Sequence, residues 1–315
     1  MVEYEVVANE KIRHLHILVN EISFRPSHVH NEAEILFALS GKGSLTVNKE
    51  TLSISEGDIA VVNSSQTHEI RSEEKLTFLI IQISSYFLND YYPKLRNIRF
   101  LKNLIARDDP AYPEIRDLLL RIGNIYFHAE EHYELSCVGL LCQLIGIILD
   151  QIPYQVMSER EFGRMVRNQK RIDRITSYID ENYQGPIRLK DIAENEKITI
   201  THLSHLIKDT YGMGFQEYLN YIRFQHSLRL LGNKSLSLTD IAFESGFSDI
   251  KYLNQMYLNT FHKTPKQMRS SLPEEIPSRE KSAITLENIL DRDQSIEVLS
   301  GIISQKQERC GLFRE

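Results

Sequence analysis

Three patterns of apolar and polar positions follow one another along this chain of 315 residues. Up to about Ser85, short apolar stretches alternate with polar positions, and glycine or asparagine residues punctuate them at regular intervals. Period-2 alternation with regular turns is typical of an antiparallel β sandwich or barrel. We therefore predict a β domain over residues 1–85. The stretches that carry the pattern are EILFALSG, SLTVNKETLSI, DIAVVNSS and LTFLIIQIS.

From residue 86 to residue 160 the apolar residues change to spacings of three and four, which predict amphipathic helices. One set runs from Ile115 to Tyr126 and another from Val138 to Ile152. We interpret the segment 86–160 as helices that either cover the β domain or pair two copies of the chain. The longest apolar run, Val138 to Leu149, is too short to span a bilayer and contains Gln143, so no membrane partner is expected.

The segment 169–271 is predicted to be wholly helical and contains an internal repeat. Asp191-Ile192-Ala193 recurs as Asp240-Ile241-Ala242. An apolar stripe at i, i+3 and i+4 follows each copy. Two copies with a period of about 50 residues indicate a duplicated supersecondary unit. The stripes are Leu203, Leu206 and Ile207 in the first copy and Leu253, Met256 and Tyr257 in the second.

Each copy reads as two helices joined by a tight turn. In the second copy we expect Thr239 to cap a short helix, Gly246 to end it in the left-handed conformation, and Ser248 to cap the next helix. In the first copy Lys197 stands where Gly246 stands in the second, and Thr199 is the expected cap. Such a unit is a helix-turn-helix, whose second helix fits the major groove of DNA.

Charge and cysteine usage agree with this interpretation. Between Arg167 and Ser271 there are 15 basic and 11 acidic residues, whereas the net charge of the whole chain is −6, so the repeat is the part suited to a polyanion. The beginning of the chain lacks the apolar core of a signal peptide, and the three cysteines form no CxxC pair. We expect free thiols and a cytoplasmic protein.

The second copy resembles the signature of the AraC/XylS transcription regulators. The matching elements are Ile241-Ala242, Gly246-Phe247-Ser248-Asp249, Tyr252, Phe261, Thr264-Pro265 and Arg269. The resemblance implies two recognition helices that enter successive major grooves on one face of the DNA. It also implies, position by position, which residues read bases and which contact phosphates. The base-reading candidates are Thr201, His202, Ser204, His205, Asp249, Lys251, Asn254 and Gln255, and the phosphate candidates are Lys208, Arg223 and Lys263.

The chain departs from the family pattern at three places. His205 and Gln255 stand where arginine is common, Tyr257-Leu258 replaces a Phe-Lys pair, and His262 replaces a glycine before the Thr-Pro turn. The second unit is therefore expected to bind DNA more weakly than the first. Because each unit then offers few phosphate contacts, tight binding should require a second copy of the chain.

The β domain carries a second group of candidate residues. The string HVHNEAEILFALSG places His28, His30 and Glu34 in one motif, and His68 follows Gly57-Asp58. The spacing resembles the cupin barrel, in which three histidines and a glutamate share one pocket. Because alternate strand residues face the same side, His28 and His30 are expected to converge.

Three interpretations of His28, His30, Glu34 and His68 remain open. They line a pocket for a small polar metabolite, they bind a divalent metal, or they are polar residues at a barrel mouth without a ligand. The second cupin motif is incomplete, because Asn63 replaces its usual proline and Ser72 its usual asparagine. Regulators of the resembled family usually keep the barrel but not the metal, so we expect a metabolite pocket and no cofactor.

The sequence thus predicts an α+β protein with an antiparallel cupin-like barrel (1–85), a helical dimerisation segment (86–160) and a tandem helix-turn-helix domain (169–271). The remaining segment, 272–315, is a charged C-terminal tail with a helix expected near Ser295 to Glu308. We predict an effector-responsive, homodimeric transcription regulator that binds double-stranded DNA and is not an enzyme, with RNA polymerase as a further candidate partner. The alternative is a metal-dependent cupin enzyme with an accessory helical domain.

Overall fold

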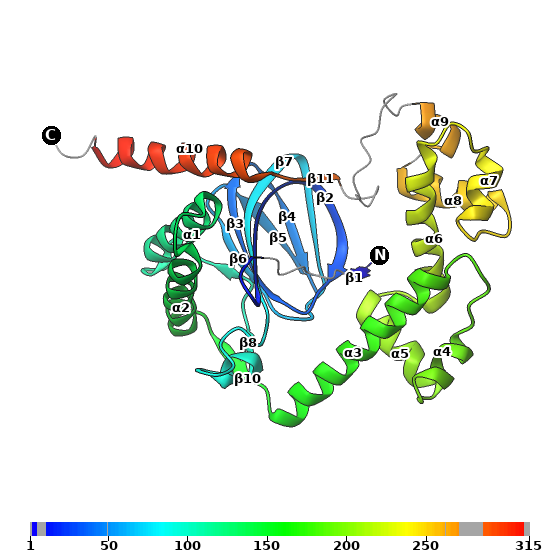
Figure 1. The fold of residues 1–315 in the computed structure, drawn as a ribbon, viewed down its shortest axis with the longest axis horizontal. Coiled ribbons are helices and arrows are strands. Elements are labelled where there is room, and N and C mark those ends of the chain that lie inside the picture. Colours follow the sequence, from blue (N-terminus) through cyan, green and yellow to red (C-terminus); the bar gives the residue numbers. More distant parts are fainter. Residues whose placement is uncertain (1, 5–10, 49, 262, 271–285, 312–315) are drawn as a thin grey trace. The chain divides into compact units, whose positions relative to one another are not determined.

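The chain divides into two compact units (Figure 1). The computed structural model describes residues 2–4, 11–48, 50–261, 263–270 and 286–311. The first unit, here called the sheet unit, comprises Glu5–Met165 and Leu286–Glu315. The second, the helical unit, comprises Val166–Thr285 and Met1–Tyr4, which includes the short strand β1 (Val2–Tyr4). The chain therefore leaves the sheet unit, builds the helical unit and returns.

A curled antiparallel sheet forms the framework of the sheet unit, as the alternation predicted. Strand β7 is its longest strand and pairs with β2, β3 and β4, while β6 joins β3 to β9 and β5 extends β4. A separate pair, β8 and β10, is also antiparallel. The bounds are β2 (Leu15–Val29), β3 (Ala33–Ser40), β4 (Lys42–Val47), β5 (Glu50–Ser55), β6 (Ile59–Val62), β7 (His68–Ile83), β8 (Ile98–Phe100), β9 (Leu104–Ile105), β10 (Tyr154–Val156) and β11 (Leu286–Ile289).

The sheet separates two apolar cores. Alternate residues of β7 go to opposite faces: Leu79 and Ile81 pack with the helices, whereas Phe78 and Ile80 pack inside the curl of the sheet, which we call the lumen. This explains why β3 and the end of β7 read as continuous apolar runs rather than as a clean alternation. Both faces are buried, so both sets of side chains are apolar.

Three helices pack on the outer face of the sheet: α1 (Tyr112–His128), α2 (Tyr133–Gln151) and α10 (Arg292–Gly311) (Figure 1). The predicted inner stripe of α1 is buried, with Ile115 and Ile122 fully covered. By length and composition α2 could also cross a membrane, and core helices of globular proteins meet the same criterion. A short 3-10 helix, η1 (Pro93–Asn97), leads into β8.

The segment predicted to be a charged tail contributes structure to the sheet unit. Strand β11 pairs antiparallel with β2, and α10 packs against α1. Arg292 donates to the carbonyl oxygens of Phe127 and His128 at the end of α1, which attaches the start of α10. The helix expected near Ser295 to Glu308 is present as α10, while residues 271–285 lie outside the described residues.

The helical unit is the predicted pair of helix-turn-helix units joined by one long helix. The linking helix α6 is buried on several sides: Tyr218 stacks on Tyr211 of α5 at 3.9 Å, and Phe224 meets Tyr257 of α8 at 5.0 Å. The bounds are α3 (Glu159–Asn182), which begins in the sheet unit, α4 (Leu189–Asn195), α5 (Ile200–Tyr211), α6 (Phe215–Leu231), α7 (Leu238–Glu244), α8 (Ile250–Phe261) and α9 (Pro265–Ser270).

The two turns repeat the same backbone hydrogen bonds. The amide of Ile198 donates to the carbonyl of Ala193 at 3.0 Å, and the amide of Phe247 donates to that of Ala242 at 2.9 Å. Lys197 and Gly246 both have a left-handed backbone, with φ of 53° and 84°. The sequence alignment of these two positions is therefore confirmed, and the first turn holds a side chain in a conformation that favours glycine.

The caps of the second unit differ from those predicted. Helix α7 begins at Leu238, and its cap is Ser237 rather than Thr239, because Ser237 and Asp240 form a reciprocal capping box. The side chain that accepts from the first turn of α8 is Asp249 rather than Ser248, through the amide of Lys251 at 2.8 Å. The cap predicted for α5 is confirmed, since the Thr199 hydroxyl accepts from the amide of His202.

The left-handed backbone at Gly246 and Lys197 predicts opposite effects of substitution at these two positions on the stability of the helical unit. A Cβ at Gly246 would lie 2.6 Å from the carbonyl oxygen of Tyr183, so Gly246→Ala should destabilise the helical unit by about 1–3 kcal/mol. Lys197→Gly should stabilise it by about 0.5–1 kcal/mol. Gly185→Ala is the matched control, because its Cβ would meet nothing closer than 3.6 Å and its effect should stay within about 0.5 kcal/mol. Urea unfolding followed by helix content measures all three, and equal losses in both alanine variants would contradict this account.

Candidate functional site

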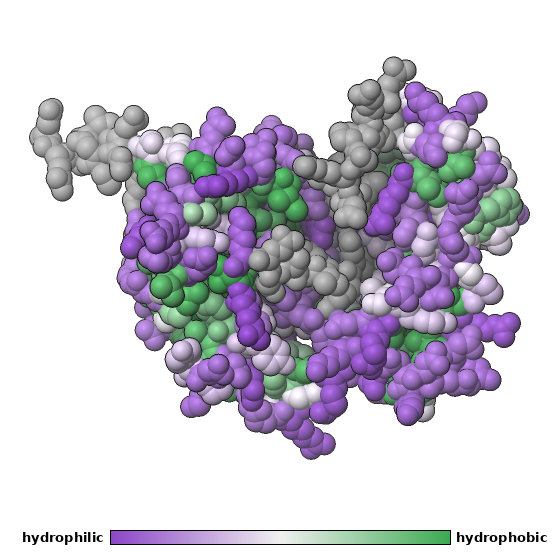
Figure 2. Space-filling model, in the orientation of Figure 1, coloured by the Kyte–Doolittle hydropathy of each residue, from purple (hydrophilic) through white to green (hydrophobic). Residues whose placement is uncertain are grey.

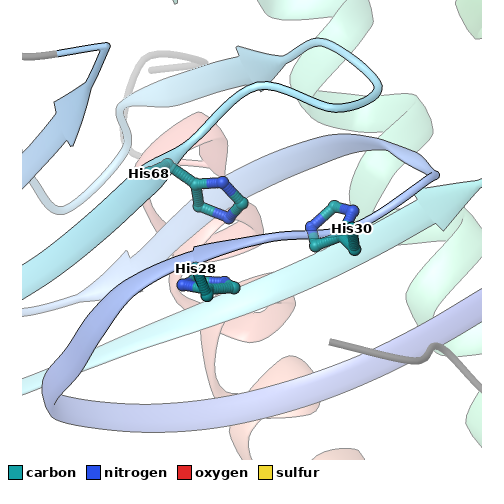
Figure 3. A group of neighbouring side chains, drawn as sticks. All are labelled: His28, His30 and His68. Carbon is teal, nitrogen blue, oxygen red and sulfur yellow. The ribbon is translucent and has the colours of Figure 1, made fainter. Parts of the chain in front are cut away.

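The cupin-like residues come together in the lumen (Figure 3). His28 lies at the end of β2 directly opposite His68, the first residue of β7, and His30 follows the end of β2. Glu34 lies on β3, opposite Gln82 of β7. All four predicted ligand-binding side chains are buried, with exposed fractions of 3% or less. Figure 3 shows the three imidazole rings around a common space.

The distances within this cluster are short. The ligand atoms of His28, His30 and His68 lie within 4.8 Å of one another. A carboxylate oxygen of Glu34 lies 3.1 Å from Nε2 of His68, and the other lies 3.6 Å from Nε2 of His30. Although 3.1 Å is close, Glu34 Oε2 and His68 Nε2 do not form a hydrogen bond of good geometry within the described part of the chain.

Backbone carbonyl groups orient the three rings. Nδ1 of His28 donates to the carbonyl of Pro26, and Nδ1 of His30 and of His68 donate to carbonyl groups two residues away in the same way, at 2.9–3.0 Å. With Nδ1 protonated, Nε2 of each ring is the lone-pair atom, and it faces the cluster. Metal-binding histidines are usually fixed by this kind of bond to the second ring nitrogen.

The carboxylate of Glu34 is also held from behind. Gln82 donates to it at 3.0 Å, and His16 donates through Nδ1 to the side-chain oxygen of Gln82 at 2.9 Å. These three residues form a row across β3, β7 and β2. The row fixes the position of Glu34 in the lumen.

The pKa values of His28 and Glu34 are both held below their ordinary values, which favours a neutral imidazole and an ionised carboxylate. Burial, followed by the charges of His68 and Arg25, holds the pKa of His28 well below its ordinary value. Burial acts to raise the pKa of Glu34, but the adjacent His30 and His68 outweigh it, and the pKa of that carboxyl is held well below its ordinary range. A neutral imidazole beside an ionised carboxylate is the state that binds cations.

A cavity of about 120 Å³ lies in the same lumen. One wall is apolar, formed by residues of β2, β3 and β7. The polar part contains His28 and Glu34 of the cluster together with Gln82, Asn20, Arg25 and Glu287 of β11. Sequence reasoning missed these last four. A signal existed for Asn20 and Gln82, because each is a polar residue inside an apolar run, but no local pattern marks Glu287.

A second cavity, of about 70 Å³, lies on the outer face of the sheet between α2 and the segment that contains η1 and β8. Asn63, the residue that departs from the cupin motif, supports its wall. Its side chain donates to the carbonyl of Phe100 at 3.0 Å and accepts from the amide of Phe100 at 2.7 Å. Asn63, which stands where the cupin motif usually has proline, therefore attaches β8 to the sheet.

In the first helix-turn-helix unit, the predicted DNA-contacting residues lie on the exposed face of α5. The apolar stripe of the same helix is buried, with Leu203 and Ile207 fully covered. A polar face that protrudes from a buried stripe is the arrangement a recognition helix needs. The exposed residues are Thr201, His202, Ser204, His205 and Lys208.

In the second unit the predicted residues are only partly available. Lys251 and Gln255 are exposed on α8, and Lys263 is exposed beyond it. Asp249 caps the helix and pairs with the ammonium group of Lys251 at 3.3 Å. Asn254 is half-buried. Sequence reasoning did not count Tyr252 among the contact residues, although it is 55% exposed on this helix. His262 lies outside the described residues.

Arg223 does not lie on an exposed face. Its guanidinium group donates to the carbonyl oxygens of Tyr183 and Gly185 at 2.8 and 2.9 Å, and burial lowers its pKa. These bonds hold the end of α3 against α6, next to the turn at Gly246. Its Nε and one Nη are therefore directed at backbone carbonyl groups, and its role as a phosphate contact stays a prediction.

The chain matches two domain families. Residues 192–271 match a helix-turn-helix domain, and residues 14–82 match a cupin domain. An uncharacterized HTH-type transcriptional regulator of Staphylococcus aureus is 22% identical over 243 residues, which are 77% of this chain and 32% of that protein. The Msm operon regulatory protein of Streptococcus mutans is 22% identical over 263 residues, which are 79% of this chain and 88% of that protein. The chain thus spans about a third of the length of the Staphylococcus aureus relatives.

Two solved structures are similar to parts of the chain. The alignment with ToxT from Vibrio cholerae includes 82% of this chain and 98% of the ToxT chain, with a TM-score of 0.43 and 14% identity. A transcriptional regulator with an AraC-type DNA-binding domain from Chromobacterium violaceum covers 33% of this chain and 94% of its own, with a TM-score of 0.31 and 26% identity.

Proposed function

We propose that this chain, which matches a helix-turn-helix domain and a cupin domain, is an AraC-type regulator that binds double-stranded DNA in response to an effector in the cupin lumen. The observation that carries the proposal is the exposed polar face of α5, which stands on a fully buried apolar stripe. The helix-turn-helix domain favours this function over the alternative of a cupin enzyme with an accessory helical domain.

A rigid connection between the two helix-turn-helix units supports the simultaneous binding of both to one DNA duplex. Helix α6 has 17 residues, which corresponds to about 26 Å. Its buried residues pack on α5 at one end and on α8 at the other. Two recognition helices fixed at the two ends of α6 can enter two grooves of one duplex without the entropy cost of ordering a flexible linker.

Base readers and phosphate contacts should respond differently to substitution. His205→Ala and Asn254→Ala should each change the preference at one base position by about 1–3 kcal/mol. Lys208→Ala should weaken binding to all sequences alike and reduce the slope of affinity against salt by about 1. Binding to a randomised DNA library at two salt concentrations measures both effects.

Asn195→Ala is the control, because Asn195 is exposed on α4 outside the recognition helix. It should leave preference and salt slope unchanged. If His205→Ala weakened all sequences equally, that residue would be assigned to the DNA backbone and not to a base.

The lumen cluster also supports a second function, the binding of a divalent cation. The donor set is three imidazoles and one carboxylate, with the rings oriented by carbonyl groups and Glu34 held by Gln82. Such a set suits zinc, manganese or iron. The cation would be held by His28, His30, His68 and Glu34. It would supply an attachment point for an oxygen atom of the effector.

The cation proposal predicts one equivalent of Mn²⁺ or Zn²⁺ per chain in equilibrium dialysis, with a rise in the unfolding temperature. His28→Ala and His68→Ala should each weaken binding more than tenfold, because each removes a ligand. His132→Ala is the matched control, since the His132 side chain is 74% exposed. Equal binding by the control and the lumen variants would refute the lumen as the site.

We also propose that α2 pairs two copies of the chain. Its outer face carries Leu135, which is 75% exposed, and glycines at 139 and 146 whose missing Cβ atoms would face open space. Apolar side chains gather over this helix in Figure 2. An exposed apolar surface with small residues allows a second helix to approach closely.

Dimerisation by α2 can be tested by sedimentation. Leu135→Glu combined with Gly146→Glu should convert a dimer to a monomer, because charge would have to be buried between the helices. Leu101→Glu is the control, since Leu101 is 60% exposed but does not lie on α2. A dimer that survives the double substitution would exclude this face as the interface.

A further inference from the structure

Strand β11 forms part of the wall of the lumen cavity, although it follows β2 by more than 250 positions in the chain. Its residues pair antiparallel with β2, with Glu287 opposite Ile22 and Ile289 opposite Asn20. Glu287 and Ile289 both line the cavity that also contains His28 and Glu34. The lumen is therefore closed on this side by a segment that returns from the helical unit.

The carboxylate of Glu287 is bound as a ligand would be. Arg25 Nη1 donates to one oxygen at 2.7 Å, and Asn20 Nδ2 donates to the other at 3.0 Å. The ion pair is largely shielded from solvent, with side-chain exposures of 12% for Arg25 and 14% for Glu287. Two donors on two oxygens make a two-point carboxylate site, and burial makes it stronger than a surface pair.

The other attachments of β11 are modest. The strand has four residues, its register shifts between Leu286 and Glu287, and Ile289 is 52% exposed. The Leu290 amide donates to the carbonyl of Val19 at 2.9 Å, and Asn288 donates to Glu21 at the surface. A strand this short has little stability of its own, so the Glu287 site adds to the backbone pairing with β2 and to the attachment of the adjoining α10 on α1 in holding it.

We propose that Glu287 is a built-in occupant of a carboxylate-binding site, and that the effector is a small organic acid that displaces it. The acid places its carboxylate on Arg25 and Asn20, and β11 leaves the edge of β2. This inference rests on the proposed function of the lumen as the effector site, and it names the chemical class of that effector.

The shape of the cavity sets the size of the acid. A volume of about 120 Å³ corresponds to roughly eight to twelve water-sized groups. One wall is apolar and the polar part continues from Arg25 to His28, Glu34 and Gln82. A compact acid with a further oxygen or hydroxyl group matches both parts. The apolar wall comprises Leu18, Ile22, Leu36, Ile70 and Ile80.

Displacement of β11 would change how the two units are connected. The chain passes between them through α3 and again through the segment that precedes β11. While Glu287 is bound, both passages are fixed to the sheet unit at their ends. When an acid takes its place, the strand is released as far as the start of α10, which Arg292 holds on α1, so the connection to the helical unit gains the length of β11.

Calorimetry on the full chain tests the carboxylate site. The probes are acetate, lactate, succinate and benzoate, with acetamide and benzamide as neutral analogues. Because Glu287 competes at a high effective concentration, Glu287→Ala should bind at least one acid at least tenfold more tightly than the unmodified chain. Glu287→Gln, which keeps the shape of the side chain, should show the same direction. Adding Arg25→Gln to Glu287→Ala should abolish the gain, and the neutral analogues should not bind.

Glu297→Ala is the matched control, because Glu297 is an exposed carboxylate on α10. The proposal is overturned if none of the acids binds Glu287→Ala, if the unmodified chain and Glu287→Ala bind them equally, or if the Arg25→Gln change leaves the gain intact. None of these measurements involves DNA, so their failure is separate from a failure of the regulator proposal.

Hydrogen exchange tests the displacement itself. A saturating acid should speed exchange of the Leu290 amide in the unmodified chain by about tenfold or more, because its bond to Val19 opens with β11. The Ala38 amide, which donates to Asp58 at 2.9 Å away from β11, serves as the internal reference. Binding of an acid without faster exchange at Leu290 would overturn the displacement.

Discussion

The antiparallel pairing of β2 with β7 is the interaction on which the sheet unit depends. These strands have 15 and 16 residues, and their pairing decides which side chains face the helices and which face the lumen. A slip of one residue would exchange the two faces. Two register shifts, between Ile22 and Phe24 and between Arg25 and His28, separate the apolar half of the pair from the half that sets His28 opposite His68. The bulges thus allow one pair of strands to build a core and a site, each in its own register.

Local patterns predicted the parts of the fold that local forces decide. The repeat is visible in the sequence because each copy must bury the same stripe and make the same turn, and the structure reproduces its hydrogen bonds at Lys197 and Gly246. The helix caps were less accurate, since several hydroxyl and carboxyl groups stand close together before α7 and α8, and small differences in geometry choose among them. The histidine cluster was predictable from two sources: strand alternation suggested that His28 and His30 face one side, and the cupin resemblance added Glu34 and His68.

Contacts between distant parts of the chain had no such signal. Arg223 has the composition of a phosphate contact, but it donates to two carbonyl groups at the end of α3. Asn63 looked like the loss of a motif, but it bonds both backbone groups of Phe100. Glu287 lies in a charged stretch without periodicity, and only the folded chain brings it to Arg25. In each case the side chain satisfies buried polar groups of a segment far away, and this requirement leaves no spacing in the sequence.

The connection between lumen and helical unit follows from the course of the chain. A ligand shifts an equilibrium only by the difference between its affinities for the two states. If the lumen were merely open, an effector could bind there without favouring any arrangement of the helical unit. Because Glu287 occupies the site only while β11 pairs with β2, the acid and the paired strand compete for Arg25 and Asn20. The acid therefore binds more tightly when β11 is released than when it is paired. The strength of the coupling is then limited by how firmly Arg25 and Asn20 hold Glu287, since a pair too weak would release β11 without the acid and a pair too strong would exclude it.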